Sequence, residues 1–194
     1  DTQRSQVSAE GGNAFGGLLL NQSHFATDGY REHSNASLDK TFAKLTLSPN
    51  ADSRLALIFT QLNQDDSQDP QGLSWDEYQA DQNAASPSAL LYDTRKTVDH
   101  RSLALNFERE FAAGTWQNTL YGGTRHVTQY QSIPKSAQLN PLSSGGVIDF
   151  DRTFAGGSSR WIQPFSLLNG ELTLTTGIDY DSSGNPDTLA HTAG

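Results

Sequence analysis

The stretch LALNFEREFAAGTWQNTLYGGTRHVTQYQ, Leu103 to Gln131, decides the fold. Before a tight turn at 112–114, Leu103, Leu105 and Phe107 alternate with Ala, Asn and Glu. After the turn, residues 117, 119, 121, 123, 125 and 127 share one face, opposite 116, 118, 120 and 122. Such alternation predicts a β-hairpin with one apolar and one polar side. Each arm exceeds the usual globular strand of about five or six residues and is long enough to cross a bilayer at a tilt.

The rest of the chain repeats this unit. Further strands are expected at 3–10, 16–30, 38–48, 54–63, 146–161 and 171–181. From residue 31 the connections are a polar loop (31–37), a turn (49–53), a long loop (64–97), the turn at 112–114, a loop (132–145) and a shorter link (162–169). Long and short connections alternate, which predicts an all-β antiparallel meander of about eight strands, with its long loops at one end. We assign 1–181 to this barrel-like domain and 182–194 to a loop-like tail.

The composition narrows the function classes. Only 35% of residues are hydrophobic, mean hydropathy is −0.58, and no run of 18 apolar residues could span a membrane as a helix. A transmembrane barrel remains compatible, because only every second strand residue need be apolar. The absence of cysteine removes thiolate metal sites, disulfides and cysteine nucleophiles. A net charge of −9 argues against nucleic-acid binding.

Several segments together resemble a known family. They are ATDGYREHS (26–34), SQDPQGLSWDEYQAD (67–81), DTRKTVDH (93–100), GTWQNTLYGGTRHVTQYQSIP (114–134) and LNGELTLTTGIDYD (168–181). In this order they are similar to the barrel of TonB-dependent outer-membrane receptors, and most of all to the siderophore and iron receptors. The resemblance covers most of residues 16–181.

The resemblance implies a fold and a function. Members of that family have a barrel of about 22 strands, filled by a plug domain that couples to TonB. Their ligands are ferric siderophores or similar iron chelates, and they lie in the outer membrane of Gram-negative cells, in contact with its lipid. This chain shows no plug, no TonB box and about a third of the strands. We therefore expect a barrel segment that does not transport alone, with no enzymatic activity, cofactor or metal site.

The long loop holds the candidate ligand contacts. Ser74-Trp75-Asp76-Glu77 has the spacing of a capping box and predicts a short helix to about Gln82. Aromatic rings in this loop, Trp75, Tyr78 and Tyr92, are the predicted ligand-binding residues. A small core that holds the loop in shape is the other interpretation of Trp75 and Tyr78. The acidic residues of the loop favour solvated side chains over a calcium site, because their spacing does not match an EF-hand. These acids are Asp65, Asp66, Asp69, Asp76, Glu77 and Asp81.

Other polar groups carry weaker signals. The five histidines lack metal-ligand spacing, which favours ordinary strand and loop positions. They are His24, His33, His100, His126 and His191. Asp179 and Asp181 share one strand face and could act as paired carboxylates. A polar ladder facing a barrel lumen is the interpretation we favour, because no base or nucleophile accompanies them. No G-x-S-x-G motif or phosphate-binding glycine loop is present.

Two rival interpretations remain open at this point. One is a self-contained eight-stranded outer-membrane barrel with a binding or structural role. The other is a soluble extracellular β-domain, such as a carbohydrate-active enzyme. The apolar strand face separates them, since a barrel exposes it as a band about 25 Å tall, whereas a sandwich buries it against a second sheet. The residues concerned are Leu55, Leu57, Phe59, Leu103, Leu105, Leu172 and Leu174. In isolation we expect a curved open sheet.

Overall fold

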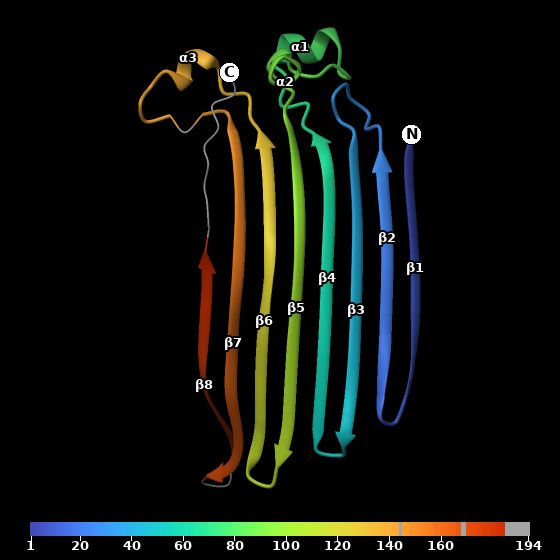
Figure 1. Ribbon diagram of the computed structural model, residues 1–194, viewed down its shortest axis with the longest axis vertical. Coiled ribbons are helices and arrows are strands. Elements are labelled where there is room, and N and C mark those ends of the chain that lie inside the picture. The colour runs from blue at the N-terminus through green and yellow to red at the C-terminus, as the bar shows by residue number, and fades with distance from the viewer. Residues whose placement is uncertain (144, 168–169, 185–194) are drawn as a thin grey trace.

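The computed structural model describes residues 1–143, 145–167 and 170–184. Its strands form one antiparallel sheet of eight, each paired with its neighbours in sequence (Figure 1). The strands are β1 (Thr2–Asn13), β2 (Gly16–Thr27), β3 (Ala36–Asn50), β4 (Ser53–Gln68), β5 (Arg95–Phe111), β6 (Gly114–Tyr130), β7 (Val147–Leu167) and β8 (Gly170–Gly184). The helices are α1 (Trp75–Ala80), α2 (Pro87–Tyr92) and α3 (Lys135–Gln138). The predicted all-β antiparallel meander is confirmed.

The two ends of the sheet differ. At the turn end, two residues each join β1 to β2, β3 to β4 and β5 to β6. Asn side chains shape two of these turns: Asn13 Oδ1 accepts the Phe15 amide at 2.8 Å, and Asn50 Oδ1 accepts the Asp52 amide at 3.1 Å. At the loop end lie the segments 28–35, 69–94, 131–143 and 145–146, with the three helices of the described chain (Figure 1). The predicted alternation of long and short connections is therefore confirmed between β2 and β7.

Most strands are longer than the sequence pattern predicted, whereas β2 ends at Thr27, three residues before its predicted end. Pairing of β4 with β5 continues past an irregularity after Gln64 to the pair Gln68–Arg95, so the irregular part of the predicted 64–97 loop is 69–94. The predicted link at 162–169 is wrong over residues 162–167, which belong to β7. Of the predicted tail, 182–184 belong to β8, and 185–194 lie outside the described residues.

Pro164 lies in the part of β7 that the sequence pattern predicted as a link. Proline cannot donate to a sheet ladder and therefore argues against a central strand. Here β6 pairs with β7 only as far as Thr115–Ile162, so beyond that point β7 has β8 as its one neighbour. A strand with one neighbour leaves one side of its backbone unpaired, which accommodates Pro164 opposite Thr173.

One side of the sheet, here called the apolar face, carries a band of large apolar side chains. The pairing register aligns Leu45, Leu57, Leu105 and Leu120 in one row across four strands. Adjacent rows on the same face contain Leu47, Leu55, Phe107, Leu20, Phe59 and Leu103. The other side, the polar face, carries most of the charged strand residues below the loops, including Lys44, Arg54, Glu108, Arg160 and Asp179.

The band is bounded at both ends. At the turn end, Trp116 and Trp161 are register partners. Phe107 meets Trp116 edge-on at 6.0 Å, and Phe111 lies 5.8 Å from Trp161. From Trp116 to the row of Leu103 the band is about 20 Å tall, at about 3.3 Å per residue. Toward the loops the same face becomes polar, with one row crossing six strands: His24, Asp39, Asn63, Asp99, His126 and Asp151.

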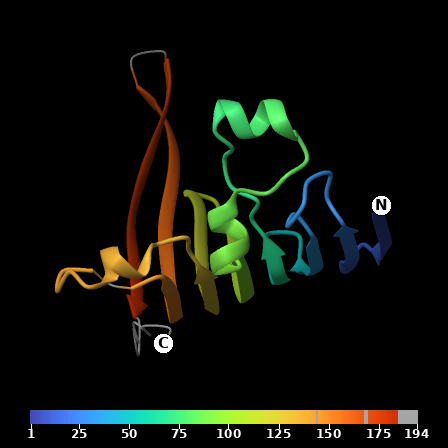
Figure 2. The same ribbon diagram turned by 90° about the horizontal axis from the view of Figure 1, so that it is seen from above.

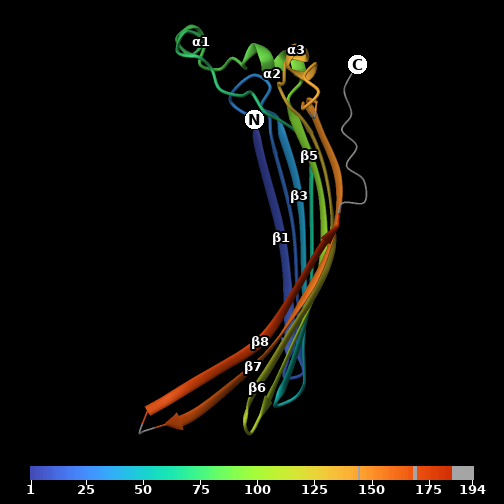
Figure 3. The ribbon, with the colours of Figure 1, turned by 90° about the vertical axis from the view of Figure 1, so that its left-hand side faces the viewer.

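The sheet is a single curved layer. Figure 2 shows the strands side by side along a curve, and Figure 3 shows the turn-end parts of β7 and β8 swinging to the side on which α1 projects. Among the described residues β1 and β8 do not pair, so the sheet is open, as expected. Leu57, Leu103 and Leu174 are 38%, 49% and 51% exposed, and no second sheet covers them in the described chain. The packing of a soluble sandwich is therefore absent here.

None of the described helices is both long and apolar enough to span a membrane.

Candidate ligand-binding site in the loop cap

The loop cap comprises residues 28–35 and 69–94, including α1 and α2. Its first helix begins as the sequence predicted. The Ser74 hydroxyl accepts the Glu77 amide at 3.3 Å, and the Glu77 carboxylate accepts the Ser74 amide at 2.7 Å. This reciprocal capping box satisfies two amides that the start of a helix leaves unpaired. α1 spans six residues and ends at Ala80, two residues before the predicted end.

Arg31 fastens one segment of the loop cap to the other. Its guanidinium donates to the Ala84 carbonyl at 2.8 Å and 3.1 Å, to the Gln71 carbonyl at 2.8 Å and to the Pro70 carbonyl at 3.4 Å. The Glu32 amide also donates to the Asn83 carbonyl at 2.7 Å. The Arg31 side chain, from the short loop 28–35, thus binds two parts of the long loop 69–94. These parts, at Gln71 and Ala84, are 13 residues apart in the sequence.

A second set of contacts closes the base of the loop cap and joins it to the loop after β6. Thr94 is buried, and its hydroxyl donates to the Asp69 carbonyl at 2.6 Å. The His33 ring nitrogen Nε2 lies 2.8 Å from the Thr94 carbonyl. Gln71 reaches the third loop by donating to the Ser132 hydroxyl at 2.8 Å. The loop cap is therefore an ordered unit, although the long irregular loop in the sequence does not by itself predict such order.

A cavity of about 540 Å³ lies between α1 and the short loop. Trp75 and Tyr78 stack on its wall with ring centroids 5.7 Å apart and planes 23° apart. Trp75 is 72% exposed and Tyr30 82% exposed, so both side chains are largely open to solvent. The lining residues are Tyr30, Arg31, Leu73, Ser74, Trp75, Tyr78, Gln82 and Asn83. This arrangement can stack on a flat or cationic group of a small ligand.

The predicted ligand contacts are only partly brought together. Trp75 and Tyr78 line the same cavity, whereas Tyr92, the last residue of α2, is half-buried and does not line it. The sequence prediction missed Tyr30 and Arg31, which stood at the border of a strand and a polar loop. No local pattern marked them, because their role comes from contacts with residues about 40 to 50 positions later.

The acidic residues of the loop serve local structure. Asp69 accepts the Gln71 amide, and Asp81 accepts the Asn83 amide, at 2.9 Å and 2.8 Å. Asp66 lies 3.2 Å from the Arg95 guanidinium. The amide of Ser74, and then its hydroxyl, lower the pKa of Glu77 below its ordinary value. Within the described ranges no group of three or more His, Cys, Asp or Glu side chains could hold a metal ion.

The other candidates have ordinary partners. His24 lies 2.8 Å from Asp39, and His126 lies 2.9 Å from Asp151, both within the polar row of the apolar face. His100 stacks on Phe154 at 5.6 Å. Asp179 pairs with Arg160 at 3.2 Å on the polar face, in keeping with a polar ladder. His191 lies outside the described residues.

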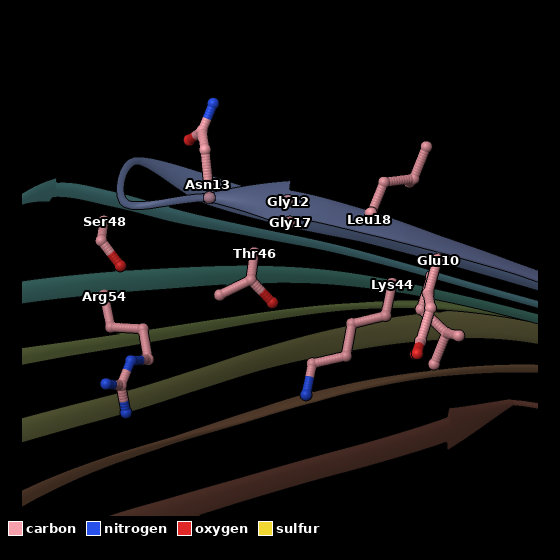
Figure 4. A pocket seen from close by; sticks show the side chains of 12 residues that line it. Glu10, Gly12, Asn13, Gly17, Leu18, Lys44, Thr46, Ser48 and Arg54 are labelled. Atoms are coloured by element: carbon pink, nitrogen blue, oxygen red, sulfur yellow. The ribbon is translucent and has the colours of Figure 1, made fainter.

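A second cavity, of about 790 Å³, lies at the turn end over β1 to β4. Figure 4 shows Lys44 and Arg54 projecting to one side of the sheet together with Glu10, while Leu18 and Asn13 point to the other side. The charged lining residues are two cations and one carboxylate. The two cavities thus lie at opposite ends of the sheet. The cavity at the turn end, whose charged lining residues are Glu10, Lys44 and Arg54, lies on the polar face.

Comparison with known proteins addresses the fold. No model of a known protein family matches the chain. Among solved structures, the chain is similar to the ferric citrate transporter FecA in its unliganded form, with a TM-score of 0.75 and 18% sequence identity. The match covers 94% of this chain and 26% of FecA, so the chain spans about a quarter of the length of that transporter. At this identity the likeness shows a barrel-type fold.

Proposed function

We propose that this chain is a section of the barrel wall of a TonB-dependent outer-membrane receptor whose parent protein takes up a ferric siderophore or a similar iron chelate. The observation that carries the proposal is the apolar face. A band of exposed leucines about 20 Å tall, with tryptophans along one border and a polar row along the other, fits the hydrocarbon layer of a bilayer. The similarity to a ferric citrate transporter supports the transport role.

The orientation follows from the two ends. Outer-membrane barrels have short periplasmic turns and long extracellular loops. The turn end therefore faces the periplasm and the loop cap faces the medium of a Gram-negative cell, with lipid around the apolar face. The polar face, with Lys44, Arg54, Glu108 and Arg160, lines the barrel interior.

The chain contributes to binding and not to chemistry. In the proposed mechanism the aromatic cavity of the loop cap captures the chelate, with Trp75 and Tyr78 as contacts and Tyr92 as a further candidate. Passage through the barrel then depends on a plug domain and on TonB, which act on the whole parent protein. Because release and passage break no covalent bond of the ligand, no catalytic residue or cofactor is required of this chain.

Three single-tryptophan variants test the membrane part of the proposal. Each retains Trp75, Trp116 or Trp161 and replaces the other two with phenylalanine. In vesicles, lipids brominated in their acyl chains should quench Trp116 and Trp161 but spare Trp75, and aqueous iodide should do the reverse. Equal quenching of all three by iodide, in vesicle-bound protein with a β-type circular dichroism spectrum, would contradict the proposal.

Binding is tested with the variant that retains Trp75. Gallium(III) replaces iron(III) so that the metal itself does not quench fluorescence. At least one of a gallium citrate and a gallium trihydroxamate should change the Trp75 emission in a saturable way, and the same variant with Tyr78→Ala should bind more weakly. No saturable change with either chelate would count against the receptor assignment.

Heat-modifiability on a gel separates this proposal from the small self-contained barrel. The unpaired β1 and β8 of the described sheet predict no compact, heat-sensitive band for the isolated chain. A compact band that shifts on boiling would show that the chain closes by itself, in favour of the rival.

A further inference from the structure

The charge of the loop cap restricts which ligands its cavity can hold. Its two segments contain seven carboxylates and only one Lys or Arg, which is Arg31. The carboxylates are Asp28, Glu32, Asp69, Asp76, Glu77, Asp81 and Asp93. Four of them directly precede or follow a cavity-lining residue in the sequence. They are Glu32, Asp76, Glu77 and Asp81. Arg31 is the one charged residue that lines the cavity itself, and these four carboxylates around it give the surroundings of the cavity a net negative charge.

Two of the seven carboxylates are in ion pairs, Asp28 with the N-terminal ammonium and Asp93 with Arg95. The four carboxylates next to the cavity form no ion pair among the described residues, and hydrogen bonding does not cancel their charges. Glu32, Glu77 and Asp81 accept backbone amides of Ala85, Ser74 and Asn83, which are neutral donors. Such bonds stabilise the ionised carboxylate and leave its full charge in place. The lowered pKa of Glu77 has this cause, so this side chain is ionised at neutral pH.

Arg31 is not a bidentate site for an anion. Four of its five N–H groups donate to backbone carbonyls at Pro70, Gln71 and Ala84. A ligand carboxylate that engaged two N–H groups of this guanidinium would have to break a contact that holds the loop cap together. A polyanionic chelate would thus gain at most a single hydrogen bond from Arg31 while it meets the four neighbouring carboxylates.

The aromatic rings add a preference for positive charge. Trp75 and Tyr78 form a stacked pair beside the cavity, and Tyr30 lines the same cavity. The faces of such rings attract ammonium and guanidinium groups. Ring faces and surrounding carboxylates therefore favour the same kind of ligand.

We propose that the loop cap selects chelates that carry a positive charge, with an ammonium group placed over Trp75 and Tyr78, and discriminates against polyanionic chelates such as ferric citrate. This inference rests on the proposed function and narrows its substrate class. It also separates the chain in ligand preference from the transporter that it resembles in fold.

One chelate in three charge states tests the inference. The probe is a gallium(III) trihydroxamate with one free amine, used as the ammonium form, as the neutral acetamide and as the anionic succinamide. Binding is followed by the emission of Trp75 in the full chain carrying Trp116→Phe and Trp161→Phe. The ammonium form should bind at least tenfold more tightly than the succinamide at low salt, and the ratio should shrink as salt rises.

Charge variants locate the effect. Asp76→Asn with Asp81→Asn keeps an oxygen acceptor for the Asn83 amide and should reduce the preference for the ammonium form at least threefold. Asp52→Asn at the turn end is the matched control and should leave the preference unchanged. Equal affinities for the three forms, or tightest binding of the succinamide, would overturn the inference while the receptor proposal stood. Absence of binding by all three forms and by gallium citrate would overturn both.

Discussion

Gly122 and Gly123 are neighbours in β6, but only one of them has room for a side chain. A Cβ on Gly123 would lie 2.3 Å from the Arg101 carbonyl oxygen and 2.6 Å from the Phe154 ring. A Cβ on Gly122 would lie no closer than 3.4 Å to its nearest contact. The difference arises because Gly123 faces the polar side, under the Phe154 ring that also stacks on His100.

Alanine at these two positions tests the register of the sheet. Gly123→Ala should destabilise the protein by about 1–3 kcal/mol, because the paired backbone of β5 cannot easily move away. Gly122→Ala should change stability by less than about 0.5 kcal/mol. Urea titrations in detergent, followed by circular dichroism, provide the measurement. A larger loss for Gly122→Ala would show that β6 pairs in a different register.

Removal of the Arg31 side chain should loosen the loop cap. Arg31→Ala leaves the carbonyls of Gln71 and Ala84 without their donor, at a cost of about 1–3 kcal/mol that falls on the loop cap alone. Limited proteolysis should then cut within 69–94 much faster, while the β-sheet signal in circular dichroism stays the same. Arg4→Ala, on the exposed strand β1, is the control. Equal cleavage rates of the two variants would contradict the anchoring role.

The capping box should contribute to the order of α1. Ser74→Ala removes the hydroxyl that accepts the Glu77 amide and should destabilise the helix by about 1 kcal/mol. Amide hydrogen exchange at Glu77 and Tyr78 is the direct measurement, and both should exchange several-fold faster. Ser86→Ala is a suitable comparison, because the Ser86 side chain makes no capping bond to α2. Unchanged exchange at Glu77 would speak against the capping box.

Acid should weaken the same helix start. The pKa of Glu77 is lower in the folded state than its ordinary value of 4.5, because the charged carboxylate accepts the Ser74 amide. The stabilisation is therefore fully present above pH 4.5 and is lost as the pH falls through the folded-state pKa. The Ser74 amide chemical shift should follow this titration, and Glu77→Gln should abolish it. A midpoint above 4.5 would contradict the sign of the shift.

Arginine on the two faces tests which side meets lipid. Leu120 is 60% exposed in the middle of the apolar band. If the band faces the bilayer, Leu120→Arg should lower the free energy of unfolding in vesicles, and so destabilise the protein, by about 2–4 kcal/mol. Thr119→Arg places the same charge on the polar face and should have a much smaller effect. Comparable losses for both variants would argue against lipid contact at Leu120.

The sequence alone predicted what depends on local pattern. Alternation assigned the residues of 103–108 and most of 116–127 to their faces, and Ser74 with Glu77 marked the start of α1, because side-chain period and capping are short-range effects. The end of β7 was missed because Pro164 is excluded only from strands with two neighbours, and the number of neighbours is a tertiary property. The role of Arg31 was missed for a related reason, since its partners are backbone carbonyls that carry no sequence signature.

The partners of Arg31 also bear on how such a loop can evolve. Every residue type supplies a carbonyl, so the identities of residues 70, 71 and 84 can drift without loss of the acceptors that Arg31 needs. The side chains of residues 72–83 can then diversify while the hydrogen bonds from Arg31 continue to hold this segment in place. A randomised library across 72–83, displayed on this sheet, would inherit a constant anchor from a single residue outside the varied region.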